Sequence, residues 1–284
     1  MEAVSKKNRR REPPPDPEPL PGLVDAHTHL AACGGRSAES VTAILDHAQR
    51  VGVEQVVTVA DDMVDARWAL QAAHWDARAF AAVGLHPTHA ADLDEAARTE
   101  LEEMVADERV VAVGETGLDN YWIGKSEDCA DAATQREAFA WHIDLAKRCG
   151  KPLMIHNREA DRELLDVLAA EGDPETVIMH CFSGDREVAR ECLDRGYLLS
   201  FSGTVTFLNA VELQAAASLV PEAQLLVETD APFLTPHPYR GQPNQSYCIP
   251  YTARALAQIR RVDVEHMADV LGANARRAYR LPLQ

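Results

Sequence analysis

The feature of this sequence that most constrains its fold is a regular alternation of short apolar runs and amphipathic segments from residue 22 onward. The apolar runs show no polar alternation, which is typical of strands buried on both faces of a parallel sheet. The segments between them have the apolar spacing of helices that cover such a sheet. The eight predicted strands are residues 22–27, 53–60, 79–86, 109–115, 151–156, 176–180, 197–203 and 224–230.

Strands that alternate with helices in this way predict a (β/α)8 TIM barrel, with a doubly wound open sheet as the alternative architecture. The length of 284 residues suits one barrel, since such domains commonly use about 250 residues. Residues 263–279 are predicted to form one or two closing helices, and we find no second domain. The other predicted helices are residues 37–50, 62–76, 94–106, 131–149, 159–171, 185–195, 209–219 and 252–260.

Residues 1–21 are predicted to be a disordered tail that precedes a barrel spanning residues 22–284. The tail opens with the basic run "KKNRRR" at residues 6–11 and continues as "EPPPDPEPLP" at residues 12–21. So many prolines are incompatible with a helix or a central strand. We therefore interpret the tail as solvated and dispensable.

Composition restricts the compartment and the partners. The six cysteines are scattered without a disulfide-like framework, no apolar run reaches the roughly 18 residues of a membrane span, and the N-terminus lacks the apolar core of a signal peptide. We predict a cytoplasmic protein with no membrane association and no obligate protein partner. The net charge of −17 argues against a protein that coats duplex nucleic acid with a basic surface. It leaves open a nuclease whose positive charge is supplied by bound metal ions.

Side chains that bind metal ions stand at the ends of six predicted strands. In a barrel, the catalytic groups gather at the carboxyl ends of the strands. His27 and His29 are two residues apart and therefore share one face of an extended strand. With 11 histidines in the chain this pair alone is weak evidence, but the whole set lies at one predicted edge. The set consists of His27, His29, His86, Glu115, His156, His180 and Asp230.

The chemistry of this set favours a pair of divalent ions. Imidazole and carboxylate ligands suit Zn²⁺ or Mn²⁺, whereas Mg²⁺ prefers an all-oxygen site. Six ligands, without His86, are too many for one catalytic ion, but they suit two ions that share a bridging carboxylate. Asp230 is also placed to accept a proton from a nucleophilic water. Asp25 shares the parity of His27 and is expected to orient an imidazole.

Several motifs occur together in one order along the chain. They are "DAHTHL" (25–30), "VGLHP" (83–87), "GETGLD" (114–119), "IHNREA" (155–160), "HCFSG" (180–184), "SFSGTVTF" (200–207) and "ETDAPFLTPHPYRG" (228–241). Together they resemble the TatD-type metal-dependent deoxyribonucleases of the amidohydrolase superfamily. The resemblance covers residues 22 to about 280.

This resemblance implies a division of the ligands between two metal ions. It implies that His27 and His29 bind one ion. It assigns His156 and His180 to the other ion. Glu115 is then the residue that bridges the two ions, at a position where many relatives use a carboxylated lysine.

The resemblance also implies roles around the ions. Asp230 binds metal and acts as the general base, while His86 and Glu228 occupy positions that matter for activity, as contacts to substrate or to the ligands. Independently, Arg158 and Arg240 are candidate phosphate clamps, because guanidinium groups pair bidentately with phosphate oxygens.

Two loops outside these ligands bear on the substrate. Trp122, which follows a predicted strand, is a candidate for stacking on a nucleobase. The motif "RGQPNQS" at residues 240–246 carries Gln242 and Gln245 where the family has a basic and an acidic residue. We expect this loop to lie over the site and to influence substrate preference.

The function predicted from the sequence is a metal-dependent hydrolase that cleaves phosphodiester bonds of DNA. It would use two divalent ions (Mg²⁺, Mn²⁺ or Zn²⁺) and act 3′→5′ on single strands or frayed ends. An alternative is an esterase, lactonase, amidase or deacylase that uses the same two ions. A non-catalytic binding protein is a third possibility, but it would predict the loss of a ligand, and none is lost.

Overall fold

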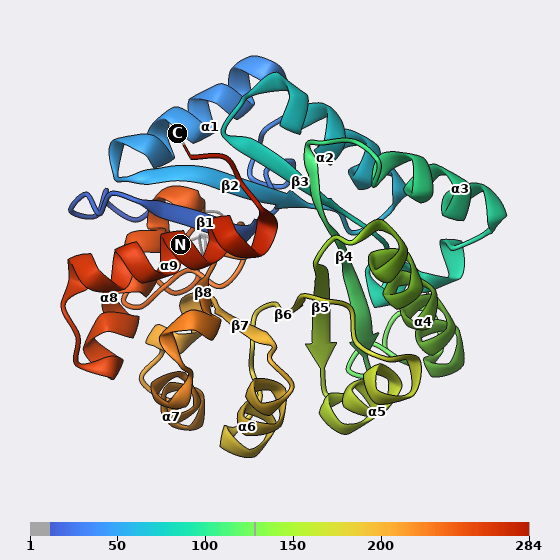
Figure 1. Ribbon diagram of the computed structural model, residues 1–284. Helices are drawn as coiled ribbons and strands as arrows, with labels where there is room; N and C mark the ends of the chain where they lie inside the picture. Colours follow the sequence, from blue (N-terminus) through green and yellow to red (C-terminus); the bar gives the residue numbers. More distant parts are fainter. Residues whose placement is uncertain (1–11, 128, 284) are drawn as a thin grey trace, which may run out of the picture.

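Eight parallel strands pair in chain order, from β1 to β8, in the computed structural model, which describes residues 12–127 and 129–283 (Figure 1). A parallel bridge between Thr28 and Ala231 brings the first strand to the end of the last. The predicted TIM barrel is thereby confirmed, since a doubly wound sheet would not follow chain order. The strands are β1 (Leu23–Thr28), β2 (Val53–Val59), β3 (Ala79–Val83), β4 (Val110–Asp119), β5 (Leu153–Arg158), β6 (Val177–Met179), β7 (Leu198–Phe201) and β8 (Leu225–Val227).

Helices surround the strands and confirm the predicted alternation (Figure 1). Aspartate or serine side chains cap many of them, as at Asp131, which accepts a hydrogen bond from the Thr134 N–H. Of the one or two closing helices predicted for residues 263–279, the structure has one, capped by Asp263. The helices are α1 (Ala38–Arg50), α2 (Met63–Trp75), α3 (Glu95–Met104), α4 (Ala132–Cys149), α5 (Asp161–Glu171), α6 (Arg186–Asp194), α7 (Val211–Leu219), α8 (Ile249–Arg260) and α9 (Val264–Tyr279), with short 3₁₀ turns at Pro87–Asp92, Gly203–Thr206, Glu222–Gln224 and Ser246–Cys248.

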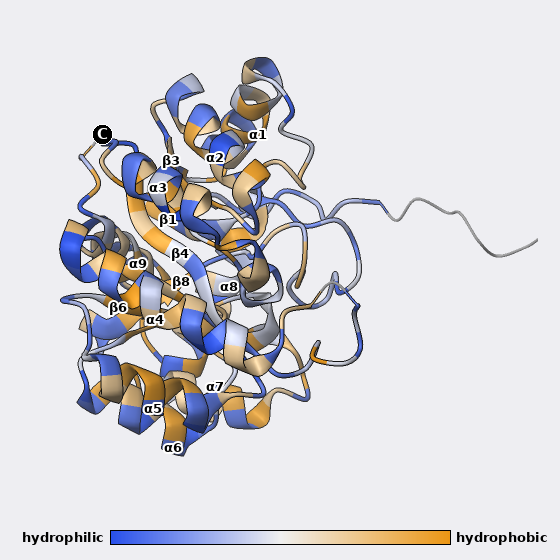
Figure 2. Ribbon diagram, turned by 90° about the vertical axis from the view of Figure 1, so that its right-hand side faces the viewer, coloured by the Kyte–Doolittle hydropathy of each residue, from blue (hydrophilic) through white to orange (hydrophobic). Residues whose placement is uncertain are grey.

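Two apolar layers build the core, and the second of them closes one end of the barrel. The larger layer lies between the sheet and the helices, which carry polar and apolar residues on the same ribbon (Figure 2). The smaller layer fills the barrel and includes Phe80, Met154 and Ile178. The end of α9 completes it, and Tyr279 donates a hydrogen bond to the carbonyl of Ala26 at 3.0 Å. The opposite end of the barrel, at the carboxyl ends of the strands, is not covered by α9, and the candidate site lies there.

The segment before β1 differs from the sequence expectation. Residues 12–20 have no helix or strand, yet they lie along α1 and α8 instead of extending away. Tyr247 and Arg254 donate hydrogen bonds to the carbonyls of Pro14 and Glu18, and the Leu20 N–H donates to the carbonyl of Val51. Proline removes N–H groups but leaves carbonyls as acceptors, so an extended proline-rich chain still packs. Residues 1–11 of the predicted tail lie outside the described residues.

No helix within residues 12–127 and 129–283 is long and apolar enough to cross a membrane.

A buried histidine in α4 fixes the backbone that leads from β3 into the site. The side chain of His142 is fully buried, its Nδ1 lies 2.7 Å from the Ala138 carbonyl, and its Nε2 accepts the Leu85 N–H at 3.2 Å. Burial lowers the pKa of His142 to about 4, so the imidazole is neutral near pH 7. Leu85 directly precedes His86, one of the predicted site residues.

We expect acid to destabilise the fold through His142. Unfolding frees this imidazole to bind a proton below pH 6.5, whereas the folded protein resists protonation until about pH 4. Relative to His142→Gln, the wild type should therefore lose about 3 kcal/mol of unfolding free energy as the pH falls from about 7 to about 4. Urea denaturation at several pH values measures this difference. Parallel pH profiles for the two proteins would refute it.

Candidate metal centre

A cavity of about 640 Å³ opens at the carboxyl ends of the strands. Most of the predicted site residues line it, while His27 lies fully buried just beneath. Glu228 and Arg240 are not among the lining residues. The predicted residues that line the cavity are His29, His86, Glu115, His156, Arg158, His180 and Asp230.

The carboxylate of Glu115 contacts histidines that come from the ends of three strands. Its Oε1 lies 2.8 Å from His156 Nδ1 and 3.3 Å from His180 Nε2. Its Oε2 lies 3.4 Å from His27 Nε2. The Glu115 side chain is 4 % exposed, so these imidazoles replace the water that a carboxylate would otherwise bind.

The environment sets the protonation of this cluster. Burial would raise the pKa of Glu115, but the charges of His180 and His27 hold it well below its usual value. Burial, reinforced by the charge of His180, holds the pKa of His27 far below its ordinary range. An anionic carboxylate and a neutral imidazole are the forms that bind metal ions.

His27, His29 and Asp230 form one half of the centre. The Nε2 atoms of the two histidines face each other at 3.2 Å, and Asp230 Oδ1 lies 3.7 Å and 3.5 Å from them. Two ligands bound to one ion at about 2.0–2.1 Å stand about this far apart, so these side chains fit a divalent ion. Burial would lower the pKa of His29, but its hydrogen bond to Asp230 and the charge of Asp61 raise it to about 9.

His156 and His180 reach Glu115 from different directions. The ring of His180 stacks on that of His27 with centroids 3.6 Å apart, while the rings of His156 and His180 are 6.3 Å apart. His86 lies on the His156 side, with its ring 4.3 Å from that of His156 and its Nε2 3.8 Å from Glu115. Thr88 fixes the orientation of His86 through a 2.7 Å contact to Nδ1.

Four overlapping groups of three side chains within the described residues could each hold a metal ion. In each group the ligand atoms lie within 4.8 Å of one another. The groups are His27–His29–Asp230, His27–His180–Glu228, His86–Glu115–His156 and His29–Asp61–Glu115.

Sequence reasoning missed two carboxylates at strand ends. Asp61 follows β2, and its Oδ1 lies 3.7 Å from His29 Nδ1. Asp119 ends β4, and its Oδ2 lies 3.0 Å from His156 Nε2. Asp61 directly follows a predicted strand, so the rule of inspecting strand ends would have identified it. Asp119 ends β4 four residues beyond the predicted strand 109–115, so that rule did not reach it. Burial raises the pKa of Asp61 to about 6.

Two further carboxylates differ in outcome, since Glu228 contacts a predicted ligand, one of the two roles expected for it, whereas Asp25 does not take its expected role. Glu228 is 1 % exposed, lies 2.8 Å from His180 Nδ1 and accepts the Cys181 N–H, so it contacts a histidine from inside the barrel and does not face substrate. Asp25 orients no imidazole. It accepts hydrogen bonds from the N–H and hydroxyl of Thr229 at 2.8 and 2.6 Å, because it faces the seam between β1 and the end of β8.

The two predicted phosphate clamps lie in different places relative to the cavity. Arg158 ends β5 and lines the cavity. Arg240 lies over the ring of Phe207 at 4.5 Å and outside the cavity lining. Gln242 and Gln245 are also not among the lining residues, although Asn244 between them donates a hydrogen bond to the carbonyl of Phe233, which lines the cavity.

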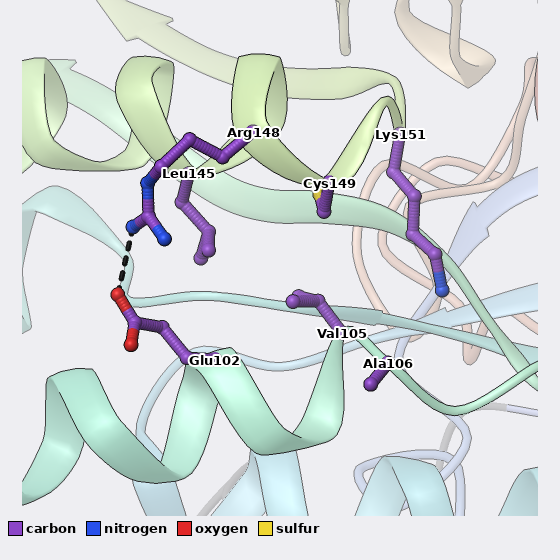
Figure 3. A pocket seen from close by; sticks show the side chains of 7 residues that line it. All are labelled: Glu102, Val105, Ala106, Leu145, Arg148, Cys149 and Lys151. Carbon is purple, nitrogen blue, oxygen red and sulfur yellow. Dashed lines mark hydrogen bonds and ion pairs between the residues drawn. The ribbon is translucent and has the colours of Figure 1, made fainter.

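A second hollow lies between the C-terminal turns of α3 and α4, at the opposite end of the barrel (Figure 3). Its charged groups already have partners: Arg148 pairs with Glu102 at 2.7 Å, and Lys151 Nζ donates to the Asp107 carbonyl at 2.8 Å. The hollow contains no histidine and offers no comparable set of ligands.

Comparisons with known proteins agree with this site. A family model described as TatD related DNase matches residues 24–280. A Mycobacterium tuberculosis protein named as an uncharacterized metal-dependent hydrolase, TatD, is 61 % identical over 259 residues, which are 91 % of this chain and 98 % of that protein. A Musicola paradisiaca protein named 3′-5′ ssDNA/RNA exonuclease TatD is 30 % identical over 84 % of this chain and 91 % of its own length.

A solved structure has the same architecture. The TatD homologue YJJV from Escherichia coli K12 matches with a TM-score of 0.84 at 27 % identity, covering 92 % of this chain and 99 % of that one.

Replacing Glu115 by Gln should weaken metal binding strongly. The amide removes the negative charge that His27, His156 and His180 share, while it keeps the shape of the side chain. Calorimetric titration with Mn²⁺ should show a drop in affinity of at least ten-fold. Glu102→Gln, at the hollow on the opposite end, serves as the control and should bind Mn²⁺ like the wild type. Equal affinity in Glu115→Gln would remove this carboxylate from the centre.

Proposed function

Because the chain belongs to the TatD-related DNase family of metal-dependent hydrolases, we propose that it is a deoxyribonuclease acting on the 3′ ends of single-stranded DNA. The observation that carries the proposal is the convergence of His27, His156 and His180 on the buried carboxylate of Glu115, inside an open cavity. The name of the Musicola paradisiaca relative supports a single-stranded nucleic acid as the substrate.

As the family resemblance implies, the ligands would divide between two divalent ions. His27, His29 and Asp230 would hold one ion, His156 and His180 would hold the second, and Glu115 would be shared between them. When bound, such ions neutralise the charge of the scissile phosphate and activate a water molecule. Which of Mg²⁺, Mn²⁺ or Zn²⁺ is used follows from activity measured with each.

Asp230 would act as the general base. Its side chain is 14 % exposed and lines the cavity, so it can reach a water there. The water oxygen attacks phosphorus, Asp230 takes the proton, the bond from phosphorus to the leaving 3′ oxygen breaks, and that oxygen gains a proton from solvent. Glu228 would position His180 through Nδ1.

The shape of the barrel favours strand ends over duplex interiors. The end of α9 closes one side of the barrel, so the cavity is open only at the carboxyl ends of the strands. Such a one-sided cavity accepts a terminus more readily than the middle of a duplex. Gln242 and Gln245, which motivated the esterase alternative, are not among the residues that line the cavity, so they provide no observation in favour of an ester substrate.

Asp230→Asn should lower kcat by roughly 10²–10⁴-fold, because it removes the proton acceptor and a ligand charge. Asp230 has a φ of 51°, a left-handed conformation that asparagine also adopts, so the backbone should be preserved. Asp269→Asn on the exposed face of α9 is the matched control and should retain wild-type turnover. Wild-type kcat in Asp230→Asn would contradict the role of Asp230.

A 5′-labelled single-stranded oligodeoxynucleotide should shorten one nucleotide at a time in the presence of a divalent ion. Duplex DNA should be cut more slowly, because its terminal bases are paired and stacked. Gel analysis with Mg²⁺, Mn²⁺ and Zn²⁺, with RNA and a p-nitrophenyl ester as competing substrates, tests this. Cleavage of circular single strands would indicate an endonuclease. Rapid ester hydrolysis without DNA cleavage would favour the alternative.

A further inference from the structure

Two adjacent aromatic residues, Tyr121 and Trp122, form an aromatic platform on the loop between β4 and α4. Their rings are perpendicular, at 83°, with centroids 5.0 Å apart. The Tyr121 ring is already engaged, since Lys125 Nζ lies 3.5 Å and the Arg158 guanidinium 3.8 Å from its centroid. Trp122 is 39 % exposed and lines the cavity. Trp122 is therefore the member of the pair that has a surface left for a ligand.

One buried carboxylate connects this platform to the metal centre. Asp119 is 1 % exposed, and its Oδ1 accepts the Trp122 N–H at 3.0 Å. Its Oδ2 lies 3.0 Å from Nε2 of His156. A second turn contact, from the Lys125 N–H to the Trp122 carbonyl at 2.9 Å, closes the loop on itself. The backbone at Trp122 is thus tied to a carboxylate that also contacts His156, a predicted ligand of the centre.

A cation stands beside the platform. Arg158 lines the same cavity, and its guanidinium is 5.8 Å from the Trp122 ring. Within residues 12–127 and 129–283, no carboxylate forms an ion pair with Arg158, although the chain carries a net charge of −17. A guanidinium of this kind is available to a phosphate.

We propose that Trp122 is the stacking surface for the base of the 3′-terminal nucleotide, with Arg158 holding an adjacent phosphate. This subsite rests on the proposed nuclease function and specifies its substrate. Every base has a π face, so stacking of this kind tolerates sequence, and it requires a base that is not already stacked in a duplex. The platform thereby explains a preference for single strands without any contact to base edges.

The test compares two oligodeoxynucleotides that differ only in the terminal base. One ends in thymidine and the other in an abasic tetrahydrofuran unit, so both offer the same phosphates. For the wild type, kcat/KM should be roughly 5- to 150-fold higher with the base present, the range expected for one stacked base. In Trp122→Ala this ratio should fall toward one, and Trp122→Phe should restore most of it.

Two controls separate Trp122 from its surroundings. Phe233 is the other exposed aromatic residue that lines the cavity, with 57 % exposure, so Phe233→Ala tests a competing platform. Leu208→Ala removes an exposed apolar side chain that does not line the cavity. Both variants should keep the wild-type ratio. The proposal would be overturned if the ratio of kcat/KM values fell toward one in Phe233→Ala. It would also be overturned if Trp122→Ala kept the wild-type ratio.

Binding distinguishes failure of the subsite from failure of the proposed function. Fluorescence anisotropy with the Asp230→Asn protein, whose turnover is strongly slowed, measures the affinity for both oligonucleotides. Tighter binding of the thymidine end, abolished by adding Trp122→Ala, supports the subsite even if the wild type cleaves neither strand. Equal binding of both ends to Asp230→Asn would overturn the subsite even if DNA is cleaved.

Discussion

The buried carboxylate of Glu115 is the interaction on which the site depends. A carboxylate with 4 % exposure costs several kcal/mol unless charged or hydrogen-bonding groups surround it. Histidines from β1, from β5 and from the end of β6 provide these groups, and β1 is separated from the neighbouring strands β5 and β6 in the order of the sheet. The site is therefore complete only when the barrel is closed. A metal ion bound there would also stabilise the fold, since the ligands are not gathered in the unfolded chain.

The sequence predicted those features that follow from local periodicity. Apolar runs without polar alternation identified all eight strands, and the rule that barrel chemistry gathers at strand ends identified His27, Glu115 and His180. Asp61 and Asp119 satisfy the same rule. Asp61 directly follows a predicted strand, so its signal was present in the sequence, whereas Asp119 lies beyond the predicted strand 109–115 because β4 continues to Asp119.

Other features depend on contacts between distant residues, which periodicity cannot supply. Parity placed Asp25 on the face of His27, but its partner, Thr229, lies across the seam that closes the barrel. Residues 12–20 lack secondary structure, as their prolines indicate, yet Tyr247 and Arg254 from the far end of the chain hold their carbonyls. The absence of a local pattern predicts irregular backbone, and it does not distinguish a packed segment from a disordered one. The position of Gln242 and Gln245 outside the cavity lining is a third case of this kind.

We propose that two metal ions share Glu115. Electron paramagnetic resonance of the protein loaded with two equivalents of Mn²⁺ tests it directly, because two Mn²⁺ ions joined by one carboxylate are magnetically coupled. We expect a coupled spectrum for the wild type and, for Glu115→Gln, only the resolved hyperfine pattern of isolated Mn²⁺. An isolated pattern in the fully loaded wild type, or coupling that survives in Glu115→Gln, would contradict it.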